Sequence, residues 1–469
     1  MKTIYSLFIL FALSCSQITA QVFEVDTILY NGDDDNRINI VFLGDGYQAS
    51  ELPKYNQDVV NTVDDLFSTT PFIQYRDYFN VFAINVPSLE SGASHPGTAL
   101  DEPSSSNQPT GTVVNNFFNS TFDFAGIHRL VVAQDGFAIS NVLADNFPNY
   151  DQVFILVNSE FYGGSGGASA ISTTHVDASE IAIHEIGHSF ANLADEYYAG
   201  DFFSAELANM TQETNPAFVR WKNWYGDQGV GIYQHCCSGN SANWYRPHQN
   251  CKMRILGVPF CAVCTETFVE TIHDLVSPID DYTPSQLQLT NQGQDLIFKA
   301  DLIYPDPNTL AITWLLNGNL LTTDVDSISL SSSLLETGSN QLTIMVDDQT
   351  PLSRADLHTP NHLFSVNWEI EKTTTSIQSI GQERKLHWNV YPNPTKDRLQ
   401  VNYELDQGSE VQIVLYDQLG QLIQQSPSTR QASGEHDYAI DMSQLPTGNY
   451  RLQLLIDGIP FSRPIVKME

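Results

Sequence analysis

The stretch that decides the fold is Ile181-Ala-Ile-His-Glu-Ile-Gly-His-Ser-Phe-Ala-Asn-Leu-Ala-Asp-Glu-Tyr197. Its apolar spacing, after the N-cap candidate Asp177, predicts an amphipathic helix. On such a helix His184 and His188 project from one face about one turn apart, so their imidazole nitrogens can bind one metal ion. Glu185 lies one step round the helix, where it can reach a water molecule beside that ion. His-Glu-x-x-His is typical of zinc hydrolases, in which the metal acidifies a water and the glutamate accepts its proton.

A catalytic zinc ion needs a third protein ligand. In a continuous helix Asp195 would lie about 10 Å beyond His188 along the axis, at about 1.5 Å per residue, which is too far to share the ion. Asn192 can adopt the left-handed conformation that ends helices and lets the chain turn back. We therefore predict Asp195 as the third ligand, with Glu196 as the alternative. The competing interpretation is a helix that simply contains buried or solvated histidines.

The region around this helix alternates strand-like and helix-like stretches. Apolar spacing over 55–67 predicts another amphipathic helix, and short β-branched or aromatic runs predict strands at 38–43, 79–86, 130–133 and 153–157. The alternation predicts an α/β domain over residues 21–276.

After Ser277-Pro278 the sequence predicts strands without helices, at 295–303, 309–316 and 341–346. Asn317-Gly318 directly follows a strand and is a strong signal for a tight turn. We predict an immunoglobulin-like β-sandwich over 280–372. A linker rich in Thr, Ser and Gln follows at 373–388.

The N-terminus resembles an export signal. Lys2 precedes an apolar run, Ile4 to Leu13, and the small residue Ala20 ends the predicted signal peptide, 1–20. Lipidation of Cys15 is the alternative. No later segment has the uninterrupted apolar length of a transmembrane helix. The formal net charge of −34 would repel nucleic acid, so we predict no nucleic-acid partner.

The last segment, 389–469, carries three separated motifs: Val390-Tyr-Pro-Asn-Pro394, Leu415-Tyr-Asp417 with Gly420, and Leu445-Pro-Thr-Gly-Asn-Tyr450. In this order they resemble the C-terminal sorting domain of substrates of the type-nine secretion system, a second all-β unit. The resemblance implies a secreted or cell-surface protein whose partner is the outer-membrane secretion machinery. In that family the sorting domain is usually cleaved after export.

The helix motif and its continuation to Tyr197 resemble the zinc motif of the secreted bacterial metallopeptidases named for IgA peptidase. Further segments that carry the resemblance are Gly44-Asp-Gly-Tyr47, Ser91-Gly92 with Pro96, Tyr162-Gly-Gly-Ser-Gly-Gly167, Cys251-Lys-Met-Arg254 and Phe260-Cys-Ala-Val-Cys264. The resemblance covers about 22–275 and implies a metzincin-like catalytic domain. It also implies that Zn2+ is bound by His184, His188 and Asp195, that Glu185 is the general base and acid, and that Met253 lies in a turn beneath the metal.

The sequence departs from the strict metzincin pattern. That pattern has a glycine and the third ligand three and six residues after the second histidine, where this chain has Ala191 and Ala194. Shifted by one residue, Asn192 and Asp195 keep the same three-residue step. With this shift, chain geometry and the resemblance both predict Asp195 as the third ligand.

We therefore predict a secreted zinc endopeptidase that hydrolyses peptide bonds in extracellular proteins, with a protein or peptide as substrate. A catalytically silent surface binding protein that retains the peptidase fold is the alternative. A zinc hydrolase with non-peptide substrates is a third hypothesis. The intact His-Glu-x-x-His favours the enzyme.

Five cysteines remain after export: Cys236, Cys237, Cys251, Cys261 and Cys264. An oxidising destination favours disulfides, and the odd number leaves one thiol over. Alternatively, the last three could form a second zinc site with His248.

Two loops have open roles. The acidic run Asp33-Asp34-Asp35 is expected to be a solvated turn, with a calcium site as the alternative. The glycine-rich segment 162–167 is expected to border the cleft, because glycines permit close backbone approach by a substrate.

Overall fold

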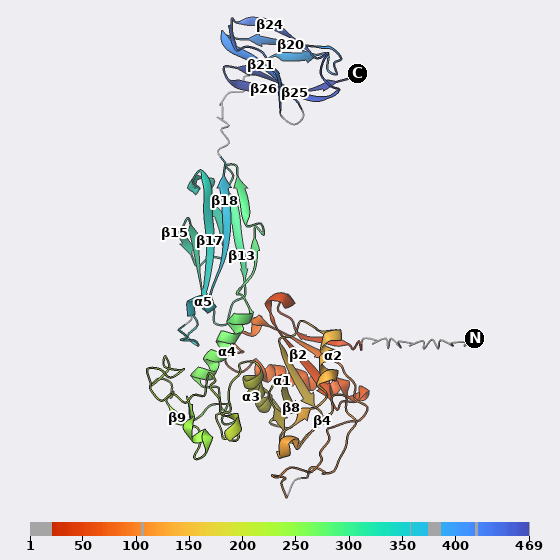
Figure 1. The fold of residues 1–469 in the computed structure, drawn as a ribbon, viewed down its shortest axis with the longest axis vertical. Helices are drawn as coiled ribbons and strands as arrows, with labels where there is room; N and C mark the ends of the chain where they lie inside the picture. Colours follow the sequence, from red (N-terminus) through yellow and green to blue (C-terminus); the bar gives the residue numbers. More distant parts are fainter. Residues whose placement is uncertain (1–20, 105–106, 357, 374–385, 418–420, 469) are drawn as a thin grey trace, which may run out of the picture. The chain divides into compact units, whose positions relative to one another are not determined.

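The computed structural model describes residues 21–104, 107–356, 358–373, 386–417 and 421–468. The chain divides into two compact units, Met1–Thr375 and Ser376–Glu469, each drawn as a ribbon in Figure 1. The predicted signal peptide and residues 374–385 of the predicted linker lie outside the described residues.

A six-stranded sheet forms the centre of the N-terminal region. In spatial order its strands are β1 (Val25–Leu29), β3 (Phe79–Ile84), β2 (Ile38–Asp45), β6 (Gln152–Val157), β8 (Ala170–Thr173) and β7 (Gly164–Ser165). The four inner strands are parallel, and the edge strands β1 and β7 are antiparallel to their neighbours. Strands β2, β3 and β6 are buried along their whole length, as expected where both faces of a parallel sheet are covered.

Four helices cover the two faces of this sheet: α1 (Leu52–Leu66), α2 (Gly136–Asn146), α3 (Ala178–Ser189) and α4 (Ala262–Leu275). Alternate residues of β2 face opposite sides, so that Phe42 packs in a core with α1, α3 and α4, whereas Val41 packs in a second core with Val142 of α2. The α/β character predicted for this region is confirmed.

The predicted strand at 130–133 is largely wrong. Only β5 (Val132–Ala133) forms there, and it pairs with β4 (Ser120–Thr121) outside the main sheet. Residues 129–131 instead lie along the edge strand β7: the Val131 amide donates to Gly164 O at 3.3 Å, and the Gly164 amide donates to Arg129 O at 3.1 Å. The segment thereby caps the edge of the sheet beside α3.

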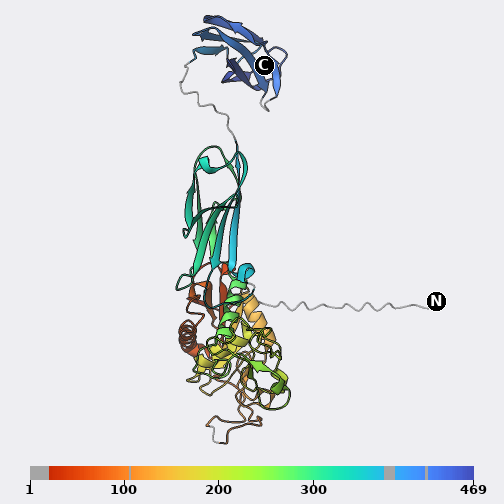
Figure 2. The same ribbon diagram turned by 90° about the vertical axis from the view of Figure 1, so that its left-hand side faces the viewer.

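Residues 279–372 form two sheets around one core. The smaller sheet has the order β11 (Ile279–Thr283), β13 (Leu296–Leu302) and β16 (Ser327–Leu330). The larger has the order β12 (Gln288–Asn291), β18 (Leu363–Lys372), β17 (Gly338–Asp348), β14 (Leu310–Leu316) and β15 (Asn319–Thr323). Their long strands run alongside one another in both views (Figures 1 and 2).

The core between these sheets centres on Trp314 and Trp368, whose rings stack with centroids 5.9 Å apart. Asn317 and Gly318 both have positive φ and connect β14 to β15, as the tight-turn signal predicted. The one α-helix among the described residues of this region is the short α5 (His358–His362), between β17 and β18; a 3-10 helix spans Ser332–Leu334.

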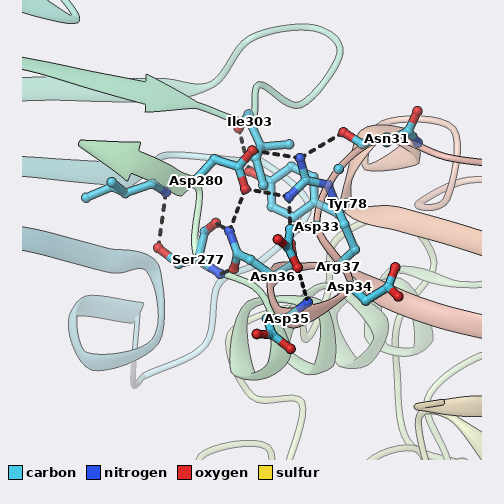
Figure 3. Close-up of polar contacts among 12 residues, drawn as sticks. Asn31, Asp33, Asp34, Asp35, Asn36, Arg37, Tyr78, Ser277, Asp280 and Ile303 are labelled. Atoms are coloured by element: carbon cyan, nitrogen blue, oxygen red, sulfur yellow. Dashed lines mark hydrogen bonds and ion pairs between the residues drawn. The ribbon is translucent and has the colours of Figure 1, made fainter. Parts of the chain in front are cut away.

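A polar junction joins the α/β region to the strands after it (Figure 3). The Arg37 guanidinium, 3% exposed, donates to both carboxylate oxygens of Asp280 at 2.6 and 2.9 Å. Asn36 bonds to Ser277 in both directions, and the Tyr78 hydroxyl donates to Ile303 O at 2.9 Å. A bidentate, mostly buried ion pair of this kind fixes geometry as well as contributing energy.

The acidic run Asp33-Asp34-Asp35 supports this junction. The Asp33 carboxylate accepts from the Asp35 amide at 3.2 Å, and Asp34 accepts from Asn80 at 3.2 Å. Among the described residues, none of the three carboxylates belongs to a group with metal-ligand spacing. The solvated turn predicted here is confirmed: Asp33 and Asp35 are exposed, and Asp33 caps the short 3-10 helix Asp34–Asn36.

A second junction connects α4 to the end of β17 and to α5. Asp348, fully buried, accepts hydrogen bonds from the Tyr75 hydroxyl at 2.7 Å and lies 2.8 Å from His273 Nε2. Glu270 of α4 lies 2.8 Å from His362 Nε2 and accepts from Asn361. Buried polar contacts therefore hold the two regions of the first unit together.

The second unit consists of two sheets around its own core. One has the order β19 (Trp388–Tyr391), β20 (Arg398–Leu405) and β24 (Gly434–Asp441). The other contains β22 (Leu422–Gln425), β21 (Ser409–Asp417), β25 (Gly448–Ile456) and β26 (Ile459–Lys467), and β23 (Thr429–Gln431) pairs with β21. Across the described part of the chain, no helix is both long and apolar enough to cross a membrane.

Candidate active site

Helix α3 carries both histidines of the motif. The Nδ1 atom of His184 lies 2.9 Å from Lys252 O, and the Nδ1 atom of His188 lies 2.7 Å from Leu193 O. A carbonyl oxygen can only accept, so each Nδ1 carries a proton. In the neutral form of each ring, Nε2 then keeps a lone pair that can bind a metal.

A chain reversal after α3 brings in the third side chain. Asn192 has φ 50°, the left-handed conformation that the sequence predicted, and its amide donates to His188 O at 3.2 Å. The next residues are held by Asn209, which exchanges hydrogen bonds with both backbone groups of Ala194. As a result, Asp195 Oδ1 lies 3.1 Å from His184 Nε2 and 3.2 Å from His188 Nε2.

The three side chains fit a zinc ion. Their ligand atoms lie within 4.8 Å of one another, and two imidazole nitrogens with one carboxylate oxygen are a typical set for a catalytic zinc site. Burial favours the neutral forms, but the contacts between the groups outweigh it: the pKa of Asp195 is lowered and the pKa of His188 is raised to about 9. The site thus favours a positive charge beside the Asp195 carboxylate.

Glu185 lies beside this trio. Its Oε2 is 4.0 Å from His188 Nε2, and burial raises the pKa of its carboxyl. Gly166, from the glycine-rich segment, packs directly on it: a β-carbon at Gly166 would come within 2.8 Å of Glu185 Oε2 and of His188 Cβ. Gly166 thus lies at the site, as predicted for the segment 162–167. Because it has no β-carbon, it leaves room for Glu185.

Several segments besides α3 bound the cleft in front of the trio. Residues from 124–132, 162–167, 192–207 and 252–256 contribute to its lining. Arg129 lies 5.7 Å from the centre of the Tyr197 ring, and both side chains line the cleft. No motif in the sequence predicts that Arg129 lies in the cleft. Its position depends on how residues 129–131 pair with β7.

Met253 lies beneath the helix. It is fully buried, and a β-carbon at Gly187, between the two histidines, would meet its sulfur at 2.5 Å. The Met253 carbonyl accepts from the Glu196 amide at 2.7 Å, and the preceding carbonyl, that of Lys252, accepts from His184. The turn therefore supports both the helix and the loop segment that follows Asp195.

Glu196, the alternative third ligand, points away from the histidines. Its side chain is fully buried, with Oε1 3.3 Å from Cys264 Sγ and 3.2 Å from Asn209 Nδ2. Of the two acidic neighbours, only Asp195 belongs to the group with His184 and His188.

The disulfides expected from the cysteine count are not formed. All five cysteines that the structure describes are free. Cys251, Cys261 and Cys264 do gather in one place, but their fourth neighbour is Glu196, and His248 does not join them. The chain reversal after α3 turns Glu196 inward, so that its carboxylate, rather than His248, lies among these three thiols.

Two family models match separate parts of the chain. Residues 27–232 match the family model described as IgA Peptidase M64, and residues 389–467 match the model described as Secretion system C-terminal sorting domain. The sorting domain marks the protein as secreted or exposed at the cell surface, exported by the type-nine machinery. No curated protein matches the chain.

Several solved structures match parts of the chain. SGBP-B of the Bacteroides ovatus mixed-linkage glucan utilization locus is 15% identical over 40% of this chain and 45% of its own, with a TM-score of 0.14. Dimeric latent PorU from Porphyromonas gingivalis is 12% identical over 40% of this chain and 19% of its own, with a TM-score of 0.16. The chain thus spans less than half the length of these two proteins, and likenesses at such scores carry no weight for fold or function.

Proposed function

We propose that this protein is a secreted zinc-dependent endopeptidase that cleaves extracellular proteins. The observation that carries the proposal is the convergence of His184 Nε2, His188 Nε2 and Asp195 Oδ1 beside Glu185, within a cleft. The match of residues 27–232 to a peptidase family model supports it independently. We further propose that this region is metzincin-like, with Met253 as the methionine of the turn, and that residues 280–372 form an immunoglobulin-like sandwich.

A zinc ion at this site supplies a Lewis acid that polarises the scissile carbonyl and makes a water molecule acidic. Glu185 is the general base and acid: its carboxylate takes the proton of the attacking water and passes it to the leaving amine. Gly166, which has no β-carbon, leaves the space that the glutamate occupies. Arg129 and Tyr197 line the cleft, and their polar groups are the ones we expect to orient the bound peptide.

The cleft lining suggests a side-chain preference. Apolar residues contributed by the loop before β5 and by the turn after Met253 line it, namely Phe124, Ile127, Leu130, Ile255 and Leu256. Burying apolar area contributes about 25 cal/mol per Å², so we expect cleavage next to bulky apolar residues.

The Glu185→Gln variant tests the proposal. Its activity on an unbiased peptide library should fall by at least about 10²–10⁴-fold, because the general base is lost, while its zinc content stays that of the wild type. Glu160→Gln, which changes an exposed glutamate of the same region, is the matched control and should keep full activity. A wild-type protein without zinc and without cleavage products would instead support the silent binding protein.

A further inference from the structure

A second group of metal-ligand side chains lies outside the active site. His95, Glu102, Asp123 and His128 each place one ligand atom within 4.8 Å of the others. The side chains of His95 and Asp123 are 1% and 0% exposed, so the centre of the group is shut off from water. The four residues come from loops between β3 and β5, and no motif in the sequence joins them.

The distances within this group match those of the active site. His95 Nε2 lies 3.2 Å from Glu102 Oε1 and 3.4 Å from Asp123 Oδ1, and His128 Nδ1 lies 3.1 Å from Glu102 Oε2 and 3.4 Å from Asp123 Oδ1. A tetrahedral zinc ion with ligands at about 2.0–2.2 Å separates them from one another by roughly 3.4 Å. The spacing therefore suits four ligands around one ion.

The polar atoms at the centre are otherwise poorly satisfied. Glu102 Oε1 and Asp123 Oδ1 are buried and accept no hydrogen bond. The other Asp123 oxygen, Oδ2, accepts from the Thr98 amide at 2.8 Å, which aims Oδ1 inward. A buried carboxylate oxygen without a partner costs about 1–3 kcal/mol or more, so a cation at this point is strongly favoured.

The tautomer of His95 leads to the same conclusion. Its Nδ1 lies 2.8 Å from Pro109 O, which can only accept, so the proton is on Nδ1. In the neutral ring Nε2 then presents a lone pair to the Glu102 and Asp123 carboxylates, an arrangement that is repulsive without a cation between them. A carbonyl partner on the other ring nitrogen is the usual second contact of a metal-binding histidine.

We propose that His95, Glu102, Asp123 and His128 bind a zinc ion with four protein ligands, distinct from the catalytic site. Imidazole ligands select zinc over calcium, which takes oxygen ligands. Because all four positions are filled by side chains, the site is structural and leaves no place for a reacting water.

The ion would shape one wall of the cleft. Asp123 and His128 bracket the segment 124–127, which lines the cleft, and the Asp123 amide donates to His128 O at 3.4 Å. Both ligands thus close a short loop whose residues Phe124 and Ile127 face the substrate. Loss of the ion should loosen this wall without touching the catalytic residues.

The test is metal analysis of the full-length chain in a His184→Ala/His188→Ala background. There the catalytic ligands are gone, so the result does not depend on the proposed peptidase activity. Adding Glu102→Gln and Asp123→Asn should remove one equivalent of zinc, and chelator should lower the unfolding temperature of the background chain by more than that of this variant. Equal zinc content in the two proteins overturns the site and leaves the group as ion pairs between protonated histidines and carboxylates.

Two controls keep this test decisive. His248→Ala removes a histidine of the same region that belongs to none of the described metal-ligand groups, and it should leave the zinc content unchanged. If the variant with Glu102→Gln and Asp123→Asn does not fold, anomalous scattering at the zinc edge from crystals of the wild type tests the site instead. A peak about 2.0–2.2 Å from His95 Nε2 and His128 Nδ1 supports the site, and the lack of any peak there contradicts it.

A different set of contacts carries a second proposal. Glu196, Cys251, Cys261 and Cys264 are all buried, with one ligand atom from each within 4.8 Å of the others. The sulfurs of Cys251 and Cys264 are 3.7 Å apart, close to the roughly 3.8 Å edge of a tetrahedron with zinc–sulfur bonds of about 2.3 Å. Glu196 Oε2 is buried without a hydrogen-bond partner.

The backbone around these thiols suits thiolates. Cys261 is the N-cap of α4, and Cys264 is in the first turn of that helix, where the dipole stabilises negative charge. The Cys261 amide also donates to Cys251 Sγ at 3.3 Å. We infer that these three thiolates and the Glu196 carboxylate bind a structural zinc ion that ties the loop after Asp195 to the turn of Met253.

Cobalt substitution tests this inference independently of the other sites. In the same His184→Ala/His188→Ala background, the cobalt protein should show thiolate-to-metal charge-transfer absorption, which sites made of imidazole and carboxylate lack. Cys264→Ser should lose this absorption, whereas Cys237→Ser, at an exposed cysteine, should keep it. Absence of the band, with Cys251, Cys261 or Cys264 recovered in a disulfide by mass spectrometry, overturns the inference.

Discussion

Asp195 Oδ1 lies 3.1 Å from His184 Nε2, although the helix that carries His184 ends at Ser189. The contact depends on the left-handed conformation of Asn192, which sends the chain back across the end of the helix. The conformation of one exposed residue thus decides whether a third ligand reaches the histidines.

Replacing Asn192 tests this dependence. Asn192→Ala should lower the free energy of unfolding by about 1–2 kcal/mol, because a β-carbon without a compensating side chain is strained at positive φ. Zinc affinity, measured by competition with a chelator, should fall by up to about 10-fold. Asn192→Gly should keep most of the stability and most of the zinc affinity. Equal losses in the two variants would show that the left-handed conformation of residue 192 is not the cause.

Gly166→Ala should damage catalysis. Its β-carbon would come within 2.8 Å of Glu185 Oε2, so the carboxylate must move, and misplacement of a catalytic group by about 1 Å can cost about 100-fold in kcat/KM. Steady-state kinetics on a peptide substrate measures the loss. Gly136→Ala is the matched control: it has open space around it at the start of α2 and should be neutral or slightly stabilising.

The α4 junction should make stability depend on pH. Burial acts to raise the pKa of Glu270, but hydrogen bonds from His362, Ser353 and Asn361 lower it to about 2, against 4.5 for the free side chain. A carboxyl with a depressed folded pKa contributes its stability fully above the unfolded value, and this contribution is lost as pH falls through the folded value. The window of loss is therefore pH 4.5 to 2.

Urea unfolding of the wild type and Glu270→Gln measures this effect. At pH 6 the substitution should cost about 2 kcal/mol, after allowing for solvent screening of a partly exposed group. At pH 3 the difference should shrink to about 1 kcal/mol or less, and a cost that stays constant between the two pH values would contradict the pKa assignment.

Truncation separates export from catalysis. Residues 21–373 contain the cores of the first unit, and Trp388 to Ile465 form a separate one, so a chain ending at 373 should fold and retain its cleavage activity. In its host the truncated chain should no longer reach the medium or the cell surface. Immunoblots of cell fractions and a peptide digest measure the two properties separately, and loss of activity on truncation would show that the second unit contributes to the site.

Local patterns predicted much of the first unit. The runs at 38–43 and 153–157 became β2 and β6 because alternate apolar residues can fill cores on both faces of a sheet. The run at 130–133 was equally apolar, yet it caps an edge strand, since that outcome depends on β7 from 30 residues farther along. The cysteine count predicted disulfides, yet the described cysteines are free, and Cys251, Cys261 and Cys264 meet Glu196, which the chain reversal turns inward.

The sequence by itself determined the helix with two histidines, the glutamate between them and the residue able to end the helix, because each depends on spacing within one or two turns. It also determined the export address, whose motifs are local. Only the tertiary structure decided between Asp195 and its alternative Glu196, brought Arg129 to the cleft, and made His95, Glu102, Asp123 and His128 meet. These groups are joined through packing between loops far apart in the chain, and no periodicity along a sequence encodes a contact of that kind.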